Sequence, residues 1–290
     1  MSQGLVKASG VAFLLAFCAV GAYCFQRGVA VHAESEGKAP TPAAEMIVAG
    51  LGGFRGLAAE VIWFRADRLQ DEGRYGELAQ LATWLTFLEP HTPEVWAYSA
   101  WNLAYNVSVM MPTPADRWRW VEAGIRLLRD DGLRLNPSDP VLYKELAWLF
   151  LMKLGGDLDN ASAFYRGEWK KTVQAVVASD RWSDIAMKKE CIERLEAVYG
   201  HQDWTDPLAS ALYWGYQGLV LAKGPIRYEL RQILFQTLML QTRKDASIAP
   251  RALQEMLKAN EERHNEVLCQ LIERFSAAYG LEINLKHGLH

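Results

Sequence analysis

The stretch Leu88–Leu103, LEPHTPEVWAYSAWNL, has a second copy at Leu135–Phe150, LNPSDPVLYKELAWLF, 47 positions further along the chain. Seven positions agree in kind: Leu88, Pro90, Pro93, Trp96, Ala100, Trp101 and Leu103 correspond to Leu135, Pro137, Pro140, Tyr143, Ala147, Trp148 and Phe150. In each copy a helix ends before the first proline, and the second proline opens the next helix at its first turn. The aromatic residue fills the groove and the alanine lets a neighbouring helix approach. The repeat therefore predicts stacked helices.

The rest of the chain also has apolar residues at helical spacing, interrupted by Gly or Pro, and no convincing period-two alternation that would predict strands. We expect helices over residues 57–72, 75–89, 93–109, 115–134, 140–154, 158–178, 183–199, 206–222, 225–243 and 249–279. The predicted fold class is all-α.

Composition limits the classes of function. Half of the 290 residues are hydrophobic and 22% are charged, so the chain has enough apolar side chains for a sizeable core. The net charge is -3, and no cluster of Lys or Arg stands out from the background, so nothing predicts a nucleic-acid partner.

The first repeat copy and the residues before it resemble tetratricopeptide repeats. The resemblance is carried by Gly73, Tyr75, Ala82, Leu85 and Leu88-Glu89-Pro90, followed by Trp96, Ala100 and Leu103. It covers about residues 57–165, and the spacing of 47 exceeds the family period of about 34 residues. The resemblance implies an α-α superhelix whose exposed groove holds a peptide or a partner helix. The chain is also similar to bacterial membrane-anchored helical-repeat proteins, a likeness that brings no known reaction.

The N-terminus contains an eighteen-residue uncharged run, Ala8–Phe25, which is long enough to cross a bilayer core as a helix. We expect one retained transmembrane signal-anchor, and the competing interpretation is a cleaved signal peptide ending near Ala33. The expected domains are an anchor at 1–33, a flexible linker at 34–44 and a helical repeat domain at 45–290. We expect that domain outside the cytoplasm, in the periplasm.

The apolar segment Met46–Phe64 follows the linker. Arg55 and Glu60 would be costly at mid-depth in a bilayer, so the segment is expected to be an interfacial or core-docked helix and not a second span. Its glycine cluster follows no predicted strand, so it does not predict a nucleotide site.

The predicted partner-binding residues are Tyr98, Asn102, Tyr105 and Asn106. Asparagine amides three and four positions from aromatic rings can grip an extended backbone. On the repeat pattern, Trp96 and Trp101 are expected to belong to the core instead.

Motifs for chemistry are weak. Glu261 and His264 form one ExxH, which fits a solvated charged helix face better than half of a metal site. His201 and Asp203 could orient an imidazole, but no nucleophile motif accompanies them. We therefore expect no catalytic, cofactor-binding or metal-binding residues.

Two further patterns leave alternatives open. Cys191 and Cys269 are expected to be free buried thiols, with a disulfide as the competing interpretation. In Arg117–Trp120, RWRW, Trp118 and Val121 are expected to face inward and the arginines outward, rather than the run binding an anion or a membrane surface.

These observations predict a non-enzymatic scaffold, anchored in a membrane, that binds a partner protein or peptide in its groove. The alternative is a cell-envelope hydrolase or metalloenzyme whose site is assembled from scattered Glu, Asp and His residues.

Overall fold

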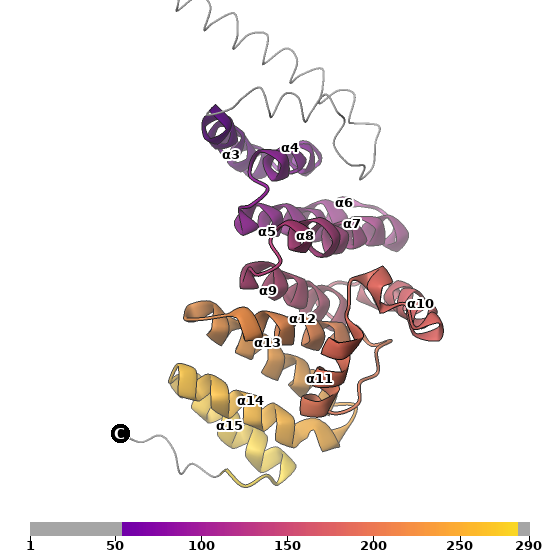
Figure 1. Cartoon of the computed structure of the whole chain (residues 1–290), viewed down its shortest axis with the longest axis vertical. Coiled ribbons are helices and arrows are strands. Elements are labelled where there is room, and N and C mark those ends of the chain that lie inside the picture. The colour runs from indigo at the N-terminus through magenta and orange to yellow at the C-terminus, as the bar shows by residue number, and fades with distance from the viewer. Residues whose placement is uncertain (1–53, 284–290) are drawn as a thin grey trace, which may run out of the picture. The chain divides into compact units, whose positions relative to one another are not determined.

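The structure is a computed structural model that describes residues 54–283 of the chain. Every regular element in this range is helical, and no strand occurs in it, so the predicted all-α class is confirmed. The chain divides into two compact units, Met1–Leu88 and Glu89–His290. Figure 1 shows the described helices, coloured along the chain. The predicted anchor and linker lie outside the described residues.

The described part of the first unit is a helical hairpin, α3 (Arg55–Asp71) and α4 (Tyr75–Leu88). Gly73 supports the turn between them with a positive φ of 69°, a conformation that costs glycine little. The guanidinium of Arg55 donates to the carbonyl oxygen of Leu88 from Nε at 3.0 Å and from Nη2 at 2.5 Å. A carbonyl that the helix end leaves unpaired thus gains a partner, and the start of α3 is tied to the end of α4.

The second unit consists of longer helices, some of which change pitch along their length. Its elements are α5 (Pro93–Trp101), η2 (Asn102–Val107), α6 (Ser108–Met110), α7 (Pro114–Arg126), η3 (Leu127–Gly132), α8 (Leu133–Leu135), α9 (Pro140–Trp148), η4 (Leu149–Gly155), α10 (Ser162–Ser179), η5 (Trp182–Ile185), α11 (Lys189–Tyr199), α12 (Pro207–Leu221), α13 (Pro225–Thr242), η6 (Ala246–Ile248), α14 (Ala249–Glu262) and α15 (Glu266–Tyr279). The segments η2, η3 and η4 are π-helical, and η5 and η6 are 3-10 helices.

The 47-residue repeat is present in the hydrogen bonds as well as in the sequence. Pro93 and Pro140 both occupy the first turn of a helix, as predicted. Nε1 of Trp96 donates to the carbonyl oxygen of Pro90 at 3.0 Å. At the equivalent positions, the hydroxyl of Tyr143 donates to the carbonyl oxygen of Pro137 at 2.9 Å. Each aromatic ring therefore fixes the turn before its own helix.

The alanines of the repeat allow helices to approach closely. Ala100 is fully buried, and a Cβ built on Gly124 of α7 would lie 2.8 Å from its carbonyl oxygen. In the second copy, Ala147 faces Gly215 of α12, whose added Cβ would lie 3.7 Å from the alanine Cβ. Small residues therefore let backbones approach at both copies.

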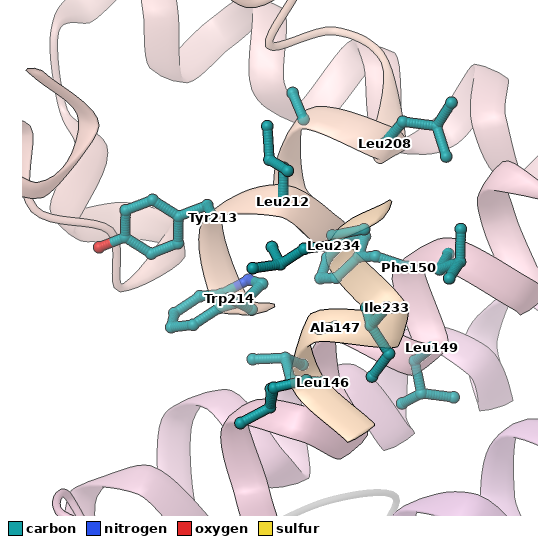
Figure 2. Packing of buried hydrophobic residues seen from close by; sticks show 14 of the residues in the cluster. Leu146, Ala147, Leu149, Phe150, Leu208, Leu212, Tyr213, Trp214, Ile233 and Leu234 are labelled. Carbon is teal, nitrogen blue, oxygen red and sulfur yellow. The ribbon is translucent and has the colours of Figure 1, made fainter. Parts of the chain in front are cut away.

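The core of the second unit is built around α9, η4, α12 and α13. Figure 2 shows Leu146 and Phe150 packed with Leu212 and Trp214 of α12 and Leu234 of α13. All five side chains are buried. The aromatic residues of the chain thus supply much of the interior of this unit.

Two predicted helices differ from the structure. The helix expected over 249–279 is broken after Glu262, where Arg263 is extended and Asn265 caps α15 by accepting from the backbone N–H of Val267 at 2.9 Å. The helix expected over 183–199 is instead η5 followed by α11, because Ala186 takes a left-handed conformation with φ of 52°. Neither break has a Gly or Pro to signal it.

We predict that Gly124→Ala destabilises the protein although alanine favours helices. The matched control is Gly167→Ala in α10, where an added Cβ meets nothing within 4 Å and the same gain in helix propensity applies. Because the Ala100 backbone must shift, the free energy of unfolding of Gly124→Ala should lie about 1–3 kcal/mol below that of the control. Urea denaturation, monitored by circular dichroism, measures the difference. Equal urea midpoints for the two variants would contradict the close contact between Gly124 and Ala100.

Candidate functional site

The continuous helix α5–η2–α6 carries all the predicted partner-binding residues. Tyr98, Tyr105 and Asn106 are half-buried on it, whereas Asn102 is fully buried. Nδ2 of Asn106 donates to Oδ1 of Asn102 at 3.0 Å. A side chain with no exposed surface cannot touch a partner in this conformation, so Asn102 positions the Asn106 amide.

The two tryptophans expected in the core have different environments. Trp96 is 5% exposed and belongs to the core, as predicted. Trp101 is 40% exposed, so its assignment to the core was wrong. Its ring stacks on that of Tyr105, with centroids 5.7 Å apart and an interplanar angle of 27°. An indole half in solvent and half on another ring is a surface suited to recognition.

One row of side chains runs along this helix at intervals of four residues: Ala97, Trp101, Tyr105 and Val109. The π-helical segment Asn102–Val107 lies in the middle of the row. A π turn contains more residues than an α turn, so side chains four apart drift less around the helix. The change of pitch therefore aligns the row, and π-helical turns are frequent at functional sites.

The first of two hollows along this row has a volume of about 260 Å³. Ala97, Tyr98 and Trp101 line it from α5, and Glu145 lines it from α9. Glu145 forms an ion pair with its neighbour Lys144 at 3.0 Å, and Lys144 also pairs with Glu229 at 2.9 Å. The hollow thus has aromatic walls and one carboxylate.

The second hollow is larger, about 460 Å³. It is lined by Tyr105, Val109, Arg117, Met152, Lys153, Leu158, Asp159 and Asn160. Nζ of the buried Lys153 forms an ion pair with Oδ2 of Asp159 at 2.7 Å and lies 5.0 Å above the ring of Tyr105. Nη1 of Arg117 donates to Oδ1 of Asn160 at 2.8 Å and lies 3.7 Å from Oδ1 of Asp159.

Neighbouring groups determine the protonation states of Asp159 and Tyr105 in the second hollow. Burial raises the pKa of Asp159, but hydrogen bonds from Lys153 and from the backbone N–H of Ala161 more than offset this, and the pKa is held below its ordinary value. Burial, followed by the charge of Glu145, raises the pKa of Tyr105. At neutral pH the tyrosine is therefore a neutral donor beside two cations and one carboxylate.

Two polar atoms in this region have no hydrogen-bond partner among the described residues. They are the hydroxyl of Tyr105 and Nδ2 of Asn102. A buried donor without a partner is costly, and such groups in native proteins call for an explanation. Tyr105 lines the second hollow, and its hydroxyl is one of these buried atoms.

Four residues that line the hollows were not predicted from the sequence: Glu145, Lys153, Asp159 and Asn160. Lys153 had a usable signal, because it is the single charge in the run Leu149–Gly155, LFLMKLG, and a lysine is rarely buried without a partner. Its partner Asp159 follows in the next loop, and only the fold shows that the two meet.

The arginines of the RWRW run differ from each other. Trp118 and Val121 are buried and Arg119 is exposed, as predicted. Arg117 is not directed fully outward, because its Nε donates to the carbonyl oxygen of Met111 at 2.9 Å and its Nη1 reaches the second hollow.

The motifs considered for chemistry do not assemble into a site. His201 lies beside Glu196, with Nδ1 and Oε1 3.3 Å apart, whereas Asp203 accepts from Thr205. Glu261 and His264 are exposed. No group of three or more His, Cys, Asp or Glu residues suited to a metal ion occurs within residues 54–283. Cys191 and Cys269 are free; Cys191 is buried and Cys269 half-buried.

Comparisons with protein-family models, with curated proteins and with solved structures find no match to this chain. In the part of the chain that the structure describes, no helix has the length and apolar character needed to cross a membrane.

We predict that the Lys153–Asp159 pair stabilises the second unit in a pH-dependent way. At pH 7, Asp159→Asn leaves a buried ammonium without its partner and should lower the free energy of unfolding by about 3–5 kcal/mol. Folding lowers the pKa of Asp159. Its contribution to the free energy of unfolding is therefore complete when the pH is above the ordinary pKa of an aspartate, and it is lost as the pH falls through the pKa in the folded protein. The difference in free energy of unfolding between the wild type and Asp159→Asn should therefore become smaller below about pH 4.

Asp157→Asn is the control, because Asp157 lies in the same loop but its side chain is 88% exposed. It should change the free energy of unfolding by less than about 0.5 kcal/mol. If the difference in free energy of unfolding between the wild type and Asp159→Asn is the same at pH 7 and pH 3, the stabilising role of the Lys153–Asp159 ion pair is refuted.

Proposed function

We propose that this protein is a non-enzymatic scaffold of tetratricopeptide type that binds a segment of a partner protein along α5–η2–α6. The exposed Trp101, stacked on Tyr105 beside the first hollow, is the observation that carries the proposal. Large aromatic rings in a hollow are the commonest anchors of protein interfaces. The proline-opened helices and the equivalent hydrogen bonds of Trp96 and Tyr143 support kinship with helical repeats.

The row of side chains suits an extended partner segment. Tyr98 and Trp101 offer an aromatic hollow for an apolar side chain. The amide of Asn106 offers a donor and an acceptor to a passing backbone. Further along, Arg117 and Lys153 outnumber Asp159, which favours an acidic group on the partner.

The proposal includes attachment to a membrane through residues 1–33, with the helical domain in the bacterial periplasm. Its support is the uncharged run Ala8–Phe25 followed by the charged, proline-containing linker 34–44.

The partner surface can be tested with a photocrosslinker. Benzoylphenylalanine replacing Trp101 in the full chain should yield one stoichiometric crosslinked protein in native membranes. The matched control is the same group replacing Phe164 of α10, a residue 37% exposed and so comparable to Trp101 at 40%, which should yield none.

Adding Tyr98→Ala to the Trp101 crosslinker should lower the crosslink yield about tenfold or more, as expected for loss of an interface anchor. Helicity and melting should not change. Equal yields at positions 101 and 164, or a yield insensitive to Tyr98→Ala, would refute the proposed surface.

The anchor makes a separate prediction. After washing membranes with alkaline carbonate, the full chain should remain in the pellet, and a chain lacking residues 1–33 should be in the supernatant, because only a spanning helix resists this wash. Intact mass should show that residues 1–33 are retained. Extraction of the full chain by carbonate would contradict the anchor, and a mass lacking those residues would identify a cleaved signal peptide.

A further inference from the structure

Helix α3 exposes a row of large apolar side chains. Phe54, which immediately precedes the helix, is 61% exposed, and Leu57, Val61 and Phe64 are 60%, 64% and 78% exposed. Their spacing of three, four and three residues places them along one side of the helix. A contiguous exposed apolar patch of this kind marks a binding surface more often than a chance arrangement.

The opposite side of the same helix is already occupied. Ala59, Ile62, Ala66 and Leu69 are buried, and α3 packs against α4. The exposed row is therefore a second apolar face, which the hairpin with α4 does not use.

The charges of α3 do not favour an electrostatic partner. Arg65 and Arg68 lie beside the exposed row, but Arg68 forms an ion pair with Glu72 at 3.0 Å. Glu60 and Asp67 lie on its flank. With basic and acidic side chains in balance, the occupant of the row must be bound through apolar contact.

The position of α3 in the chain, shortly after the predicted membrane anchor, indicates that a lipid bilayer is the apolar environment closest to the exposed row. Only 28 residues separate Phe25, the end of the uncharged run, from Phe54. Fully extended, they span at most about 100 Å. If Ala8–Phe25 is held in a bilayer, this tether keeps the exposed row at a high effective concentration near the lipid surface.

We propose that α3 lies along the lipid surface, with Phe54, Leu57, Val61 and Phe64 inserted at the boundary between headgroups and acyl chains. This contact rests on the proposed anchor and adds a second, interfacial attachment beside it. Phenylalanine and leucine are residue types found on the lipid-facing side of interfacial helices, and Arg65 beside the row can lie at headgroup level. Because the contact is apolar, neutral lipid suffices.

The test uses the full chain reconstituted in phosphatidylcholine vesicles, with benzoylphenylalanine replacing Phe64. Illumination should give lipid adducts at this position, detected by mass spectrometry. The control is the same group replacing Asp67 on the polar flank of α3, which should give at least about fivefold fewer lipid adducts. The adducts should persist in 0.5 M NaCl, since apolar contact is not screened by salt.

A second variant, Leu57→Glu with the crosslinker at position 64, should abolish the lipid adducts while the circular dichroism spectrum stays unchanged. Crosslinks from position 64 to residues 1–53, or to a second copy of the chain, would overturn the proposal, because the row would then be covered by protein. Equal lipid adducts at positions 64 and 67 would overturn it as well. The carbonate wash reports the anchor separately, so a chain that is anchored but lacks lipid adducts refutes the α3 contact alone.

Discussion

The helices of the second unit approach each other so closely that a single methyl group does not fit between two of them. Gly124 lies against the backbone of Ala100, and Gly218 of α12 lies against Tyr143, where an added Cβ would be 2.8 Å from the tyrosine Cβ. Contacts this short require a glycine on one of the two helices, and aromatic rings fill much of the remaining space between helices. The row of side chains on α5–η2–α6 depends on this constraint, because close packing on one side of the helix fixes which side remains exposed.

The π-helical segments have a consequence for the site. Asn102–Val107 aligns Trp101 with Tyr105, and Leu149–Gly155 contains Lys153, whose ammonium lies over the Tyr105 ring. Two π-helical segments, each beginning at the end of one copy of the repeat, therefore both contribute residues to the second hollow. A buried lysine is tolerated there because Asp159 neutralises it and the hollow leaves room for solvent or for a group from a partner.

The two units present different kinds of surface. In the second unit the exposed ring of Trp101 lies at a hollow that Glu145 also lines, as in interfaces between proteins. On α3 of the first unit, Leu57, Val61 and Phe64 form an apolar row along one side, as in helices that lie on lipid. A chain with both surfaces would hold a partner protein close to a membrane.

The sequence by itself determined the all-α class and the starts of the helices that a proline opens. Proline at the first turn is a local signal, so Pro93 and Pro140 predicted two helix starts correctly. The copies 47 residues apart predicted equivalent aromatic positions, and the structure adds that Trp96 and Tyr143 both hydrogen-bond the turn before their helix. Only the tertiary structure decided that Trp101 is exposed while Trp96 is buried, and that Lys153 meets Asp159. The physical reason is that periodicity identifies an apolar helix face but not whether a neighbouring helix covers it. That depends on the pitch of the helix and on contacts between residues distant in the chain.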